Sequence, residues 1–358
     1  MTRQALGWDL HRRFSKVTLL EQPDPLQPQV LKVVRRTRLE HADRQAMRTW
    51  LDQVPPGTPV AMEGSFGWQW VADLLAELGF EPHLGHPPAI KVLAKNEPKA
   101  DRPDADRLAR FWLRGIFPEC YLSTPDVRQI RERIRYRMAL AGSRTQIKNR
   151  LHAVLHRQGI LHDFSDLFCP RGRSFLAGLQ LPDATRYVLK HWLSLLDSVQ
   201  ALLDDVEQWM KANLEEDAIV KLLQSIPGIG LILAHVIRAE VGEIGRFAGQ
   251  RKFASYAGLA PMSNDSADRH GERHIGVACN HALRWALIEA ALSTERSKHC
   301  PPKLRLLYHR LSRGGKMRTH VARVAVAREL AELVYVLWKK GEPYREISSP
   351  GQPRRKQR

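Results

Sequence analysis

The sequence predicts a mixed α/β domain at the amino terminus, then a long helical segment, then a mainly helical carboxyl-terminal domain. Two observations support this division. Short β-type segments alternate with helical ones up to residue 118, and beyond Pro125 apolar residues recur at three- and four-residue steps. The chain of 358 residues is long enough for several cores. We expect domains at 1–124, 125–217 and 218–345, followed by a basic, disordered tail at 346–358.

The amino-terminal region reads as three strands, a helix, a strand, a helix, a strand and a helix. This is the element order of an RNase H-like domain, which fixes the expected fold class of residues 1–124. The strands are expected at 5–10, 16–20, 29–34, 58–63 and 80–84, and the helices at 41–54, 68–78 and 104–117.

Two long helices are expected to form an arm. The first, over 126–158, is strongly basic, and a loop over 160–182 separates it from a helix for which Asp183 is the expected N-cap. Alternating three- and four-residue steps in the second helix favour an antiparallel coiled coil, with an ordinary helix bundle as the alternative. The apolar seam of the second helix consists of Leu189, Trp192, Leu196, Val199, Leu203, Val206 and Met210.

The charge of the chain indicates a polyanionic partner. It has 56 Lys and Arg against 38 Asp and Glu, a formal net charge of +18, and nucleic acid is the commonest partner of such proteins. Solvated arginines alone would also account for a basic helix. We expect RNA or DNA backbone contacts instead. The residues expected to make them are Arg128, Arg131, Arg135, Lys148 and Arg150.

The segment Ser225-Ile-Pro-Gly-Ile-Gly230 is similar to a helix-hairpin-helix turn. Gly228 and Gly230 would let backbone N–H groups approach a phosphate, and the helix over 231–241 would add its positive amino-terminal end. A plain tight turn is the alternative. A last helix over 319–339 is expected to belong to the core of a mainly α domain.

Several function classes are excluded. No apolar run reaches the roughly 18 residues of a membrane span, and the first residues lack the apolar centre of a signal peptide. The four cysteines form no CxxC pair, which argues against a zinc ribbon and a disulfide framework. We expect a cytoplasmic protein without a membrane partner.

Four carboxylates form the expected catalytic centre. Asp9 lies on the first strand, Glu63 ends the fourth, and Asp101 and Asp104 begin the last helix of the domain. Each acid alone would pass for a surface charge, but these element positions converge in an RNase H-like sheet. Four converging carboxylates repel one another unless cations neutralise them, so two Mg²⁺ ions are expected. Asp106 is out of register and is interpreted as a surface residue.

Several motifs, in the same order along nearly the whole chain, resemble those of the insertion-sequence 110 family of transposases. The amino-terminal ones are Gly7-Trp-Asp9, Glu63-Gly-Ser-Phe-Gly-Trp68 and Lys99-Ala-Asp-Arg-Pro-Asp-Ala105. The carboxyl-terminal ones are Ser225–Gly230, Arg246-Phe, Phe253-Ala-Ser-Tyr-Ala-Gly-Leu-Ala-Pro261, Asn280-His-Ala-Leu-Arg284 and Lys340-Gly-Glu-Pro-Tyr344.

The resemblance implies a RuvC-like DEDD domain, a coiled-coil arm and a second catalytic domain with a serine nucleophile. A bridge (guide) RNA would pair with double-stranded donor and target DNA. The serine would form a covalent phosphoserine with the 5′ phosphate, supported by the carboxylates and Mg²⁺ across protomers of a tetramer assembled from dimers. Ser266, five residues after Pro261, matches the family's serine. Ser263 is its competitor, and Ser255 is expected to be buried in a helix.

Cationic residues follow Ser266 closely. Arg269, His270, Arg273 and His274 would stabilise a pentavalent phosphate or bind nucleic acid, and Arg284 is expected to bind nucleic acid. The chain departs from the family pattern at Ala100, where a small hydroxyl residue is usual. It also departs at Val277-Ala-Cys279, which affects the expected loop geometry.

Two other functions remain as alternatives. A metal-dependent, structure-selective DNA nuclease, similar to a resolvase, would use the four acids and no covalent step. A non-catalytic nucleic-acid-binding protein would need neither the acids nor Ser266; four acids at matching positions argue against it.

Overall fold

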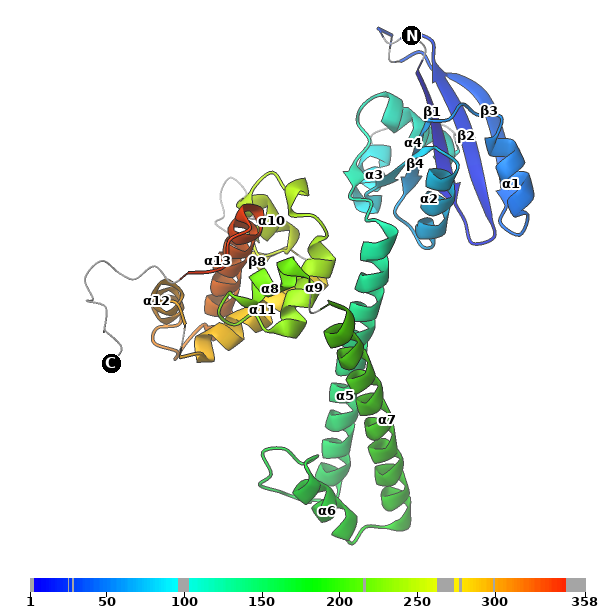
Figure 1. Ribbon diagram of the computed structural model, residues 1–358. Coiled ribbons are helices and arrows are strands. Elements are labelled where there is room, and N and C mark those ends of the chain that lie inside the picture. Colours follow the sequence, from blue (N-terminus) through cyan, green and yellow to red (C-terminus); the bar gives the residue numbers. More distant parts are fainter. Residues whose placement is uncertain are drawn as a thin grey trace, which may run out of the picture. The chain divides into compact units, whose positions relative to one another are not determined.

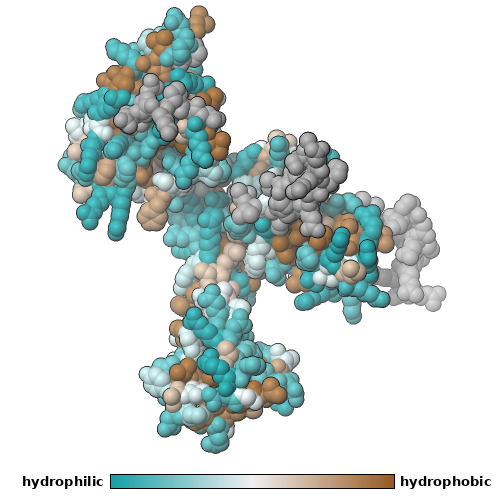
Figure 2. Space-filling model, turned by 180° about the vertical axis from the view of Figure 1, so that it is seen from behind, coloured by the Kyte–Doolittle hydropathy of each residue, from teal (hydrophilic) through white to brown (hydrophobic). Residues whose placement is uncertain are grey.

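The computed structural model describes residues 3–24, 26–27, 29–95, 103–214, 217–262, 274–276, 279–298 and 300–345. The chain divides into two compact units, Met1–Pro125 and Asp126–Arg358. Hydrophilic residues cover much of the visible surface of both units (Figure 2), as the high content of charged residues requires.

The first unit is built on a six-stranded mixed sheet with the order β3-β2-β1-β4-β5-β6. β1, β2 and β3 form an antiparallel meander (Figure 1), β4 and β5 run parallel to β1, and β6 is antiparallel to β5. The strands are β1 (Arg3–Leu10), β2 (Phe14–Gln22), β3 (Lys32–Glu40), β4 (Pro59–Glu63), β5 (Glu81–Gly85) and β6 (Glu119–Cys120).

Helices cover both faces of this sheet. Leu6 and Trp8 of β1 belong to a core shared with residues of α1 (Arg44–Leu51) and α2 (Trp68–Glu77). Ala5 of β1 instead packs with residues of α4 (Asp104–Leu113). Side chains alternate between the faces of a strand, so odd-numbered residues of β1 point toward α4. The first unit therefore has a mixed sheet with helices on both faces, and this arrangement agrees with the expected α/β class.

Three details of the first unit differ from the expectation. β3 spans Lys32–Glu40 instead of the expected 29–34. The arginine-rich residues after Val34 were not expected to be part of the strand, but they continue it as an edge strand that pairs with β2. Two elements were not expected at all, α3 (Pro87–Lys95) and the short strand β6. Helix α1 is shorter than expected and begins after Asp43, whose carboxylate accepts a hydrogen bond from the Ala46 N–H.

The second unit contains a long antiparallel helical hairpin, formed by α5 (Pro125–Arg157) and α7 (Asp183–Leu214). Contacts run in opposite directions along the two helices. Arg137 near the start of α5 pairs with Glu207, and Arg144 farther along it donates to Gln200. The seam residues expected on α7 are buried, except that Trp192 is only partly buried. One expectation was wrong: the loop expected over 160–182 contains a helix, α6 (Pro170–Gly178).

The rest of the second unit is mainly helical, and one apolar core joins it to the hairpin. A short 3-10 helix, Ile244–Arg246, and a two-stranded ribbon of β7 (Pro261–Met262) and β8 (His274–Ile275) interrupt the helices. Within the described residues, no helix is long and apolar enough to cross a membrane. The helices are α8 (Ala218–Gln224), α9 (Leu231–Val241), α10 (Gln250–Tyr256), α11 (His281–Arg296), α12 (Pro302–Leu311) and α13 (Thr319–Lys340).

Candidate active site

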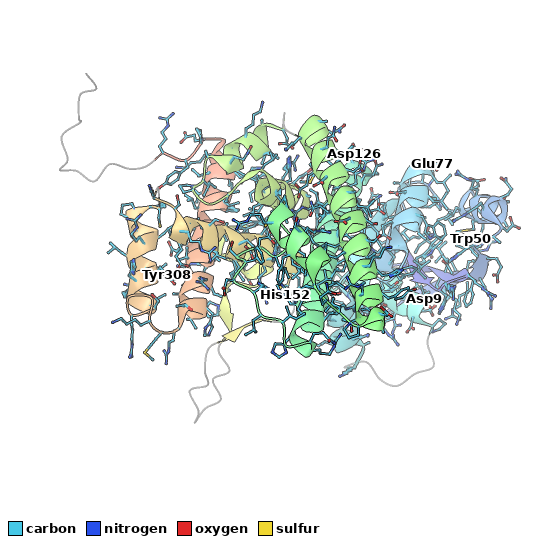
Figure 3. The ribbon with its side chains drawn as sticks, turned by 90° about the horizontal axis from the view of Figure 1, so that it is seen from below. Asp9, Trp50, Glu77, Asp126, His152 and Tyr308 are labelled. Carbon is cyan, nitrogen blue, oxygen red and sulfur yellow. The ribbon has the colours of Figure 1, made fainter. Side chains whose placement is uncertain are left out.

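Asp9 and Glu63 lie at corresponding positions of two neighbouring parallel strands. The register of β1 and β4 pairs Trp8 with Met62, and each acid follows directly. Trp8 and Met62 face the core under α1 and α2. Because side chains alternate along a strand, both carboxylates point to the opposite face, which α4 covers. Asp9 is labelled in Figure 3, as is Trp50 of α1.

The start of α4 brings a third carboxylate to this face. Asp104 is the first residue of α4. A Cβ atom at Gly7 of β1 would lie 1.8 Å from the carbonyl oxygen of Ala105, so the first turn of α4 rests directly on the backbone of β1. Gly7 is two residues before Asp9 on the same side of the strand. The side chain of Asp104 is 65% exposed and forms an ion pair with Arg107.

The pKa values of two acids reflect this convergence. Burial raises the pKa of Asp9 above the ordinary value, the positive charges of His11 and Lys16 oppose this, and the charge of Asp104 raises it further. Burial likewise raises the pKa of Glu63, with Lys91 opposing and the charges of Asp104 and Asp9 adding to the increase. The charge of Asp104 therefore acts on both Asp9 and Glu63.

A histidine that sequence reasoning missed accompanies Asp9. The Nε2 atom of His11 lies 3.1 Å from the Asp9 carboxylate. The available signal was that His11 follows Asp9 by two residues, directly after the end of β1, but only the turn between β1 and β2 brings its ring back to the carboxylate. Lys16 of β2 stands opposite Asp9 in the register, so two cationic groups flank this carboxylate.

The donor set suits a hard divalent cation, because such ions prefer carboxylate oxygens. Burial is the main reason that the pKa values of Asp9 and Glu63 are raised, and the charge of Asp104 adds to the increase at both, so a bound cation would favour their ionised forms. Among the described residues, no three His, Cys, Asp or Glu side chains lie close enough to hold a metal ion together. Asp101, the fourth expected acid, lies outside the described residues.

Asp106 corrects one expectation. It is not a surface residue but is buried, with 4% of its surface exposed. Its carboxylate accepts hydrogen bonds from the Thr18 hydroxyl at 2.7 Å and from Arg36. Residues two apart on a helix do not share a side, so Asp106 points into the sheet whereas Asp104 does not.

All five cations of α5 that were expected to bind nucleic acid have partners within the protein. Arg131 donates to the carbonyl oxygen of Ala239, and Arg135 forms two hydrogen bonds with the buried carboxylate of Glu240. Buried partners of this kind account for the two arginines without nucleic acid. Lys148 lies 3.6 Å from Asp166, and Arg150 stacks on Trp192. Arg128 also makes a contact within the protein.

The two glycines of the Ser225–Gly230 turn differ in their surroundings. Gly228 has a φ of +89°, and a Cβ atom there would lie 2.1 Å from the Thr294 hydroxyl of α11, so this glycine permits close helix packing. Gly230 precedes α9, and a Cβ atom there would meet open space. Only Gly230 therefore keeps the open surroundings that a phosphate contact requires.

The ribbon of β7 and β8 holds the two ends of the segment that carries Ser266. Arg284 of α11 donates to the carbonyl oxygens of Ala257, Gly258 and Gly276, on both sides of the ribbon. These bonds occupy the side chain that was expected to bind nucleic acid. Ser255 is exposed on α10, contrary to the expected burial. Ser263, Ser266, Arg269, His270 and Arg273 lie outside the described residues.

Comparisons with known proteins agree over both units. A model of DEDD transposases, described as "Transposase", matches residues 7–159, and a model described as "Transposase IS116/IS110/IS902 family" matches residues 220–309. A probable family 20 transposase from Pseudomonas aeruginosa is 25% identical over 96% of this chain and 99% of its own length.

Two further relatives match parts of the chain. The transposase for insertion sequence element IS1111A from Coxiella burnetii is 26% identical over 75% of this chain and 74% of its own length. A pilin gene-inverting protein from Moraxella bovis is 27% identical over 51% of this chain and 55% of its own length.

Proposed function

The chain belongs to the IS116/IS110/IS902 family of transposases, which are DNA recombination enzymes, and we propose that it cuts and rejoins donor and target DNA through a serine nucleophile assisted by a DEDD metal site. One observation carries the proposal. Asp9, Glu63 and Asp104 come from three different elements and lie on one face of the sheet, where burial and, to a smaller extent, the charge of Asp104 raise the pKa values of Asp9 and Glu63.

Asp9, Glu63, Asp101 and Asp104 would hold Mg²⁺, two ions in all. When bound, such ions polarise a phosphate and neutralise charge that develops on its oxygens. Among the protein's own groups, His11 orients the Asp9 carboxylate through its 3.1 Å contact. The Lys91 charge near Glu63 would attract the DNA backbone toward the acids.

Ser266 is the proposed nucleophile. Its Oγ atom forms a bond to phosphorus, the bond from phosphorus to the 3′ oxygen breaks, and the 3′ hydroxyl leaves with a proton. The 5′ phosphate then remains on the serine until another 3′ hydroxyl displaces it. Two features support this assignment: the ends of its segment are paired in the ribbon of β7 and β8, and Arg284 braces both sides of that ribbon.

Cutting followed by rejoining also fits the name of one relative. Inverting a pilin gene, as the Moraxella bovis protein is named for, requires that both ends of a DNA segment be cut and rejoined. For this chain we propose that a structured bridge RNA chooses the sites by base pairing. We further propose that dimers assembling into a tetramer bring the serine of one protomer to the acids of another.

A trapping assay tests the proposal. Full-length protein is mixed with Mg²⁺, the noncoding RNA that flanks its element, and end-labelled DNA with donor and target sites. Denaturing gels are then run for the wild type, Ser266→Ala, Glu63→Gln and, as a matched control, Ser255→Ala. The exposed Ser255 lies on α10 and belongs to neither strand of the ribbon. We expect an RNA-dependent protein–DNA adduct in the wild type and in Ser255→Ala only.

Other outcomes would redirect the assignment. Cleavage without an adduct, unchanged in Ser266→Ala but lost in Glu63→Gln, would identify a carboxylate nuclease without a covalent step. Nucleic-acid binding without cleavage in any variant would make the acids dispensable and contradict the proposed chemistry.

A further inference from the structure

Three paired residues form a row across the sheet directly beneath the start of α4. The register pairs Gly7 of β1 with Thr18 of β2, and Thr18 with Arg36 of β3. The carbonyl oxygen of Ala105 lies above Gly7, and a Cβ atom added to Gly7 would be 1.8 Å from this oxygen. Along this row Gly7 has no side chain, Thr18 has a short side chain with a hydroxyl group, and Arg36 has a long cationic side chain. We call this row the α4 seat.

Asp106 occupies this seat. Its carboxylate accepts the Thr18 hydroxyl proton at 2.7 Å and the Nε–H of Arg36 at 3.1 Å, and the Arg36 Nη2 atom donates to its second oxygen. Both carboxylate oxygens are thus engaged, in a side chain that is 6% exposed. A planar guanidinium that binds both oxygens fixes direction as well as distance.

Apolar packing alone would not define the position of α4 so closely. The apolar contacts of α4 with the sheet include Ala109, Leu113, Leu108 and Phe111, and apolar contacts have no preferred direction. Burying a carboxylate is costly unless it is paired and hydrogen-bonded. The Asp106 carboxylate is buried and the Arg36 side chain is half exposed, so their pairing offsets this cost only where α4 brings the two groups together.

We propose that Asp106, held by Thr18 and Arg36, is a positioning residue that fixes the first turn of α4 on the sheet and thereby sets the affinity of the neighbouring carboxylates for a divalent cation. Asp104 is two residues before Asp106, and Asp9 is two residues after Gly7. A shift of α4 along the seat therefore changes the separation of Asp104 from Asp9 directly. This inference rests on the proposed metal site.

Binding of Mn²⁺ to the full-length protein, measured by electron paramagnetic resonance without nucleic acid, tests the inference. The variants are Asp106→Ala, Asp106→Asn and Arg36→Gln, with Asp52→Asn as a control for loss of one exposed acid of the same unit. Partners that orient metal ligands typically contribute about 10- to 100-fold to metal affinity. We expect Asp106→Ala to weaken Mn²⁺ binding by that factor. Asp106→Asn, which can still accept the Thr18 hydrogen bond, should lose less, and Asp52→Asn should match the wild type.

The Mn²⁺ measurements distinguish failure of the positioning role of Asp106 from failure of the proposed metal site. Unchanged Mn²⁺ affinity in Asp106→Ala and Arg36→Gln, with wild-type binding that Asp9→Asn abolishes, would overturn the positioning role and leave the metal site standing. Absence of Mn²⁺ binding in the wild type would overturn the metal site itself. If Asp106→Ala does not fold, Asp106→Asn and Arg36→Gln decide the question, because both keep polar groups in the α4 seat.

Discussion

The carboxylates of the first unit illustrate how a single residue is tuned by its surroundings. Asp9 and Glu63 are partly buried, and both have raised pKa values because burial and neighbouring negative charges disfavour the ionised form. A carboxyl whose pKa is raised on folding destabilises the folded state at neutral pH, and this cost disappears as the pH falls through the folded pKa. A bound cation would therefore stabilise the ionised carboxylates of Asp9 and Glu63 and lower their pKa values.

Replacing Glu63 by glutamine should separate function from stability. We expect Glu63→Gln to lower strand cleavage by about 100-fold or more, because a metal-binding carboxylate is lost. The same change should raise the melting temperature in metal-free buffer, because Asp9 and Asp104 lose a repelling neighbour. Gel assays of cleavage and thermal unfolding in a chelator measure both. A lower melting temperature together with full cleavage would contradict the assignment.

Gly7 is expected to tolerate no side chain. A Cβ atom at this position would overlap the Ala105 backbone, so Gly7→Ala should displace α4 and destabilise the first unit by about 1–3 kcal/mol. Cleavage should fall with it. Gly142→Ala is a suitable control, because Gly142 lies in α5 with open space where its Cβ would be. That change should stabilise the protein by about 0.5–1 kcal/mol, as measured by denaturant unfolding. Equal stability of both variants would argue against the close approach of α4.

Among the secondary-structure elements, α5, α9 and α11 meet at one buried acid. Glu240 of α9 is 0% exposed and binds Arg135 of α5 and Asn280, the N-cap of α11. Asn280 also donates to the Tyr256 hydroxyl of α10. This network joins the base of the helical hairpin to the helices that flank the ribbon of β7 and β8.

The pH dependence of stability should report on this junction. Burial acts to raise the pKa of Glu240, but hydrogen bonds from Arg135 and Asn280 and the nearby positive charges lower it below the ordinary value. The stabilisation is therefore present above the ordinary carboxyl pKa and is lost as pH falls through the lower, folded pKa. Thermal unfolding between pH 7 and pH 3 should show this loss.

The matching variant isolates the carboxylate. Glu240→Gln should be less stable than the wild type at pH 7, because Arg135 and Arg131 lose their charged partner, and breaking a buried pair typically costs about 3–5 kcal/mol. The difference between the two proteins should shrink toward pH 3. Parallel pH profiles would mean that Glu240 is not the titrating group.

At the scale of the whole molecule, charge is the dominant property. The net charge of +18 remains after the intramolecular pairs on α5 have been counted, because pairing removes no charge from the sum. Because the five expected cations of α5 have partners within the protein, we expect much of the attraction for nucleic acid to come from other cations, including those near Ser266 and in the basic tail.

Salt should weaken nucleic-acid binding steeply. If the chain neutralises six to ten phosphates, affinity should fall about 10³- to 10⁵-fold between 50 and 200 mM salt. Filter binding or fluorescence anisotropy with the flanking RNA measures the slope. Arg135→Gln should leave the slope unchanged, since that arginine is held by Glu240, whereas Arg269→Gln should lower it by about one counterion. An equal decrease in both variants would contradict this division of roles.

The sequence by itself determined the order of elements and the faces of the strands. Alternation of apolar residues is a local signal, so it placed Asp9 and Glu63 at strand ends and Asp104 at a helix start, and motifs spread along the chain identified the family. The sequence did not predict the exact span of β3 or the short elements α3 and β6, because edge strands and short elements have only a weak periodic pattern of apolar residues.

Only the tertiary structure decided which charged residues have partners. Asp106 meets Thr18 across 88 residues of sequence, and Arg135 meets Glu240 across 105, and no local pattern encodes such pairs. Strand register and helix packing bring them together. Asp106, which was expected at the surface, is buried against Thr18 and Arg36, and Arg135, which was expected to bind nucleic acid, pairs with the buried carboxylate of Glu240. The free energy of a charge depends on what surrounds it after folding, and the local sequence does not contain those surroundings.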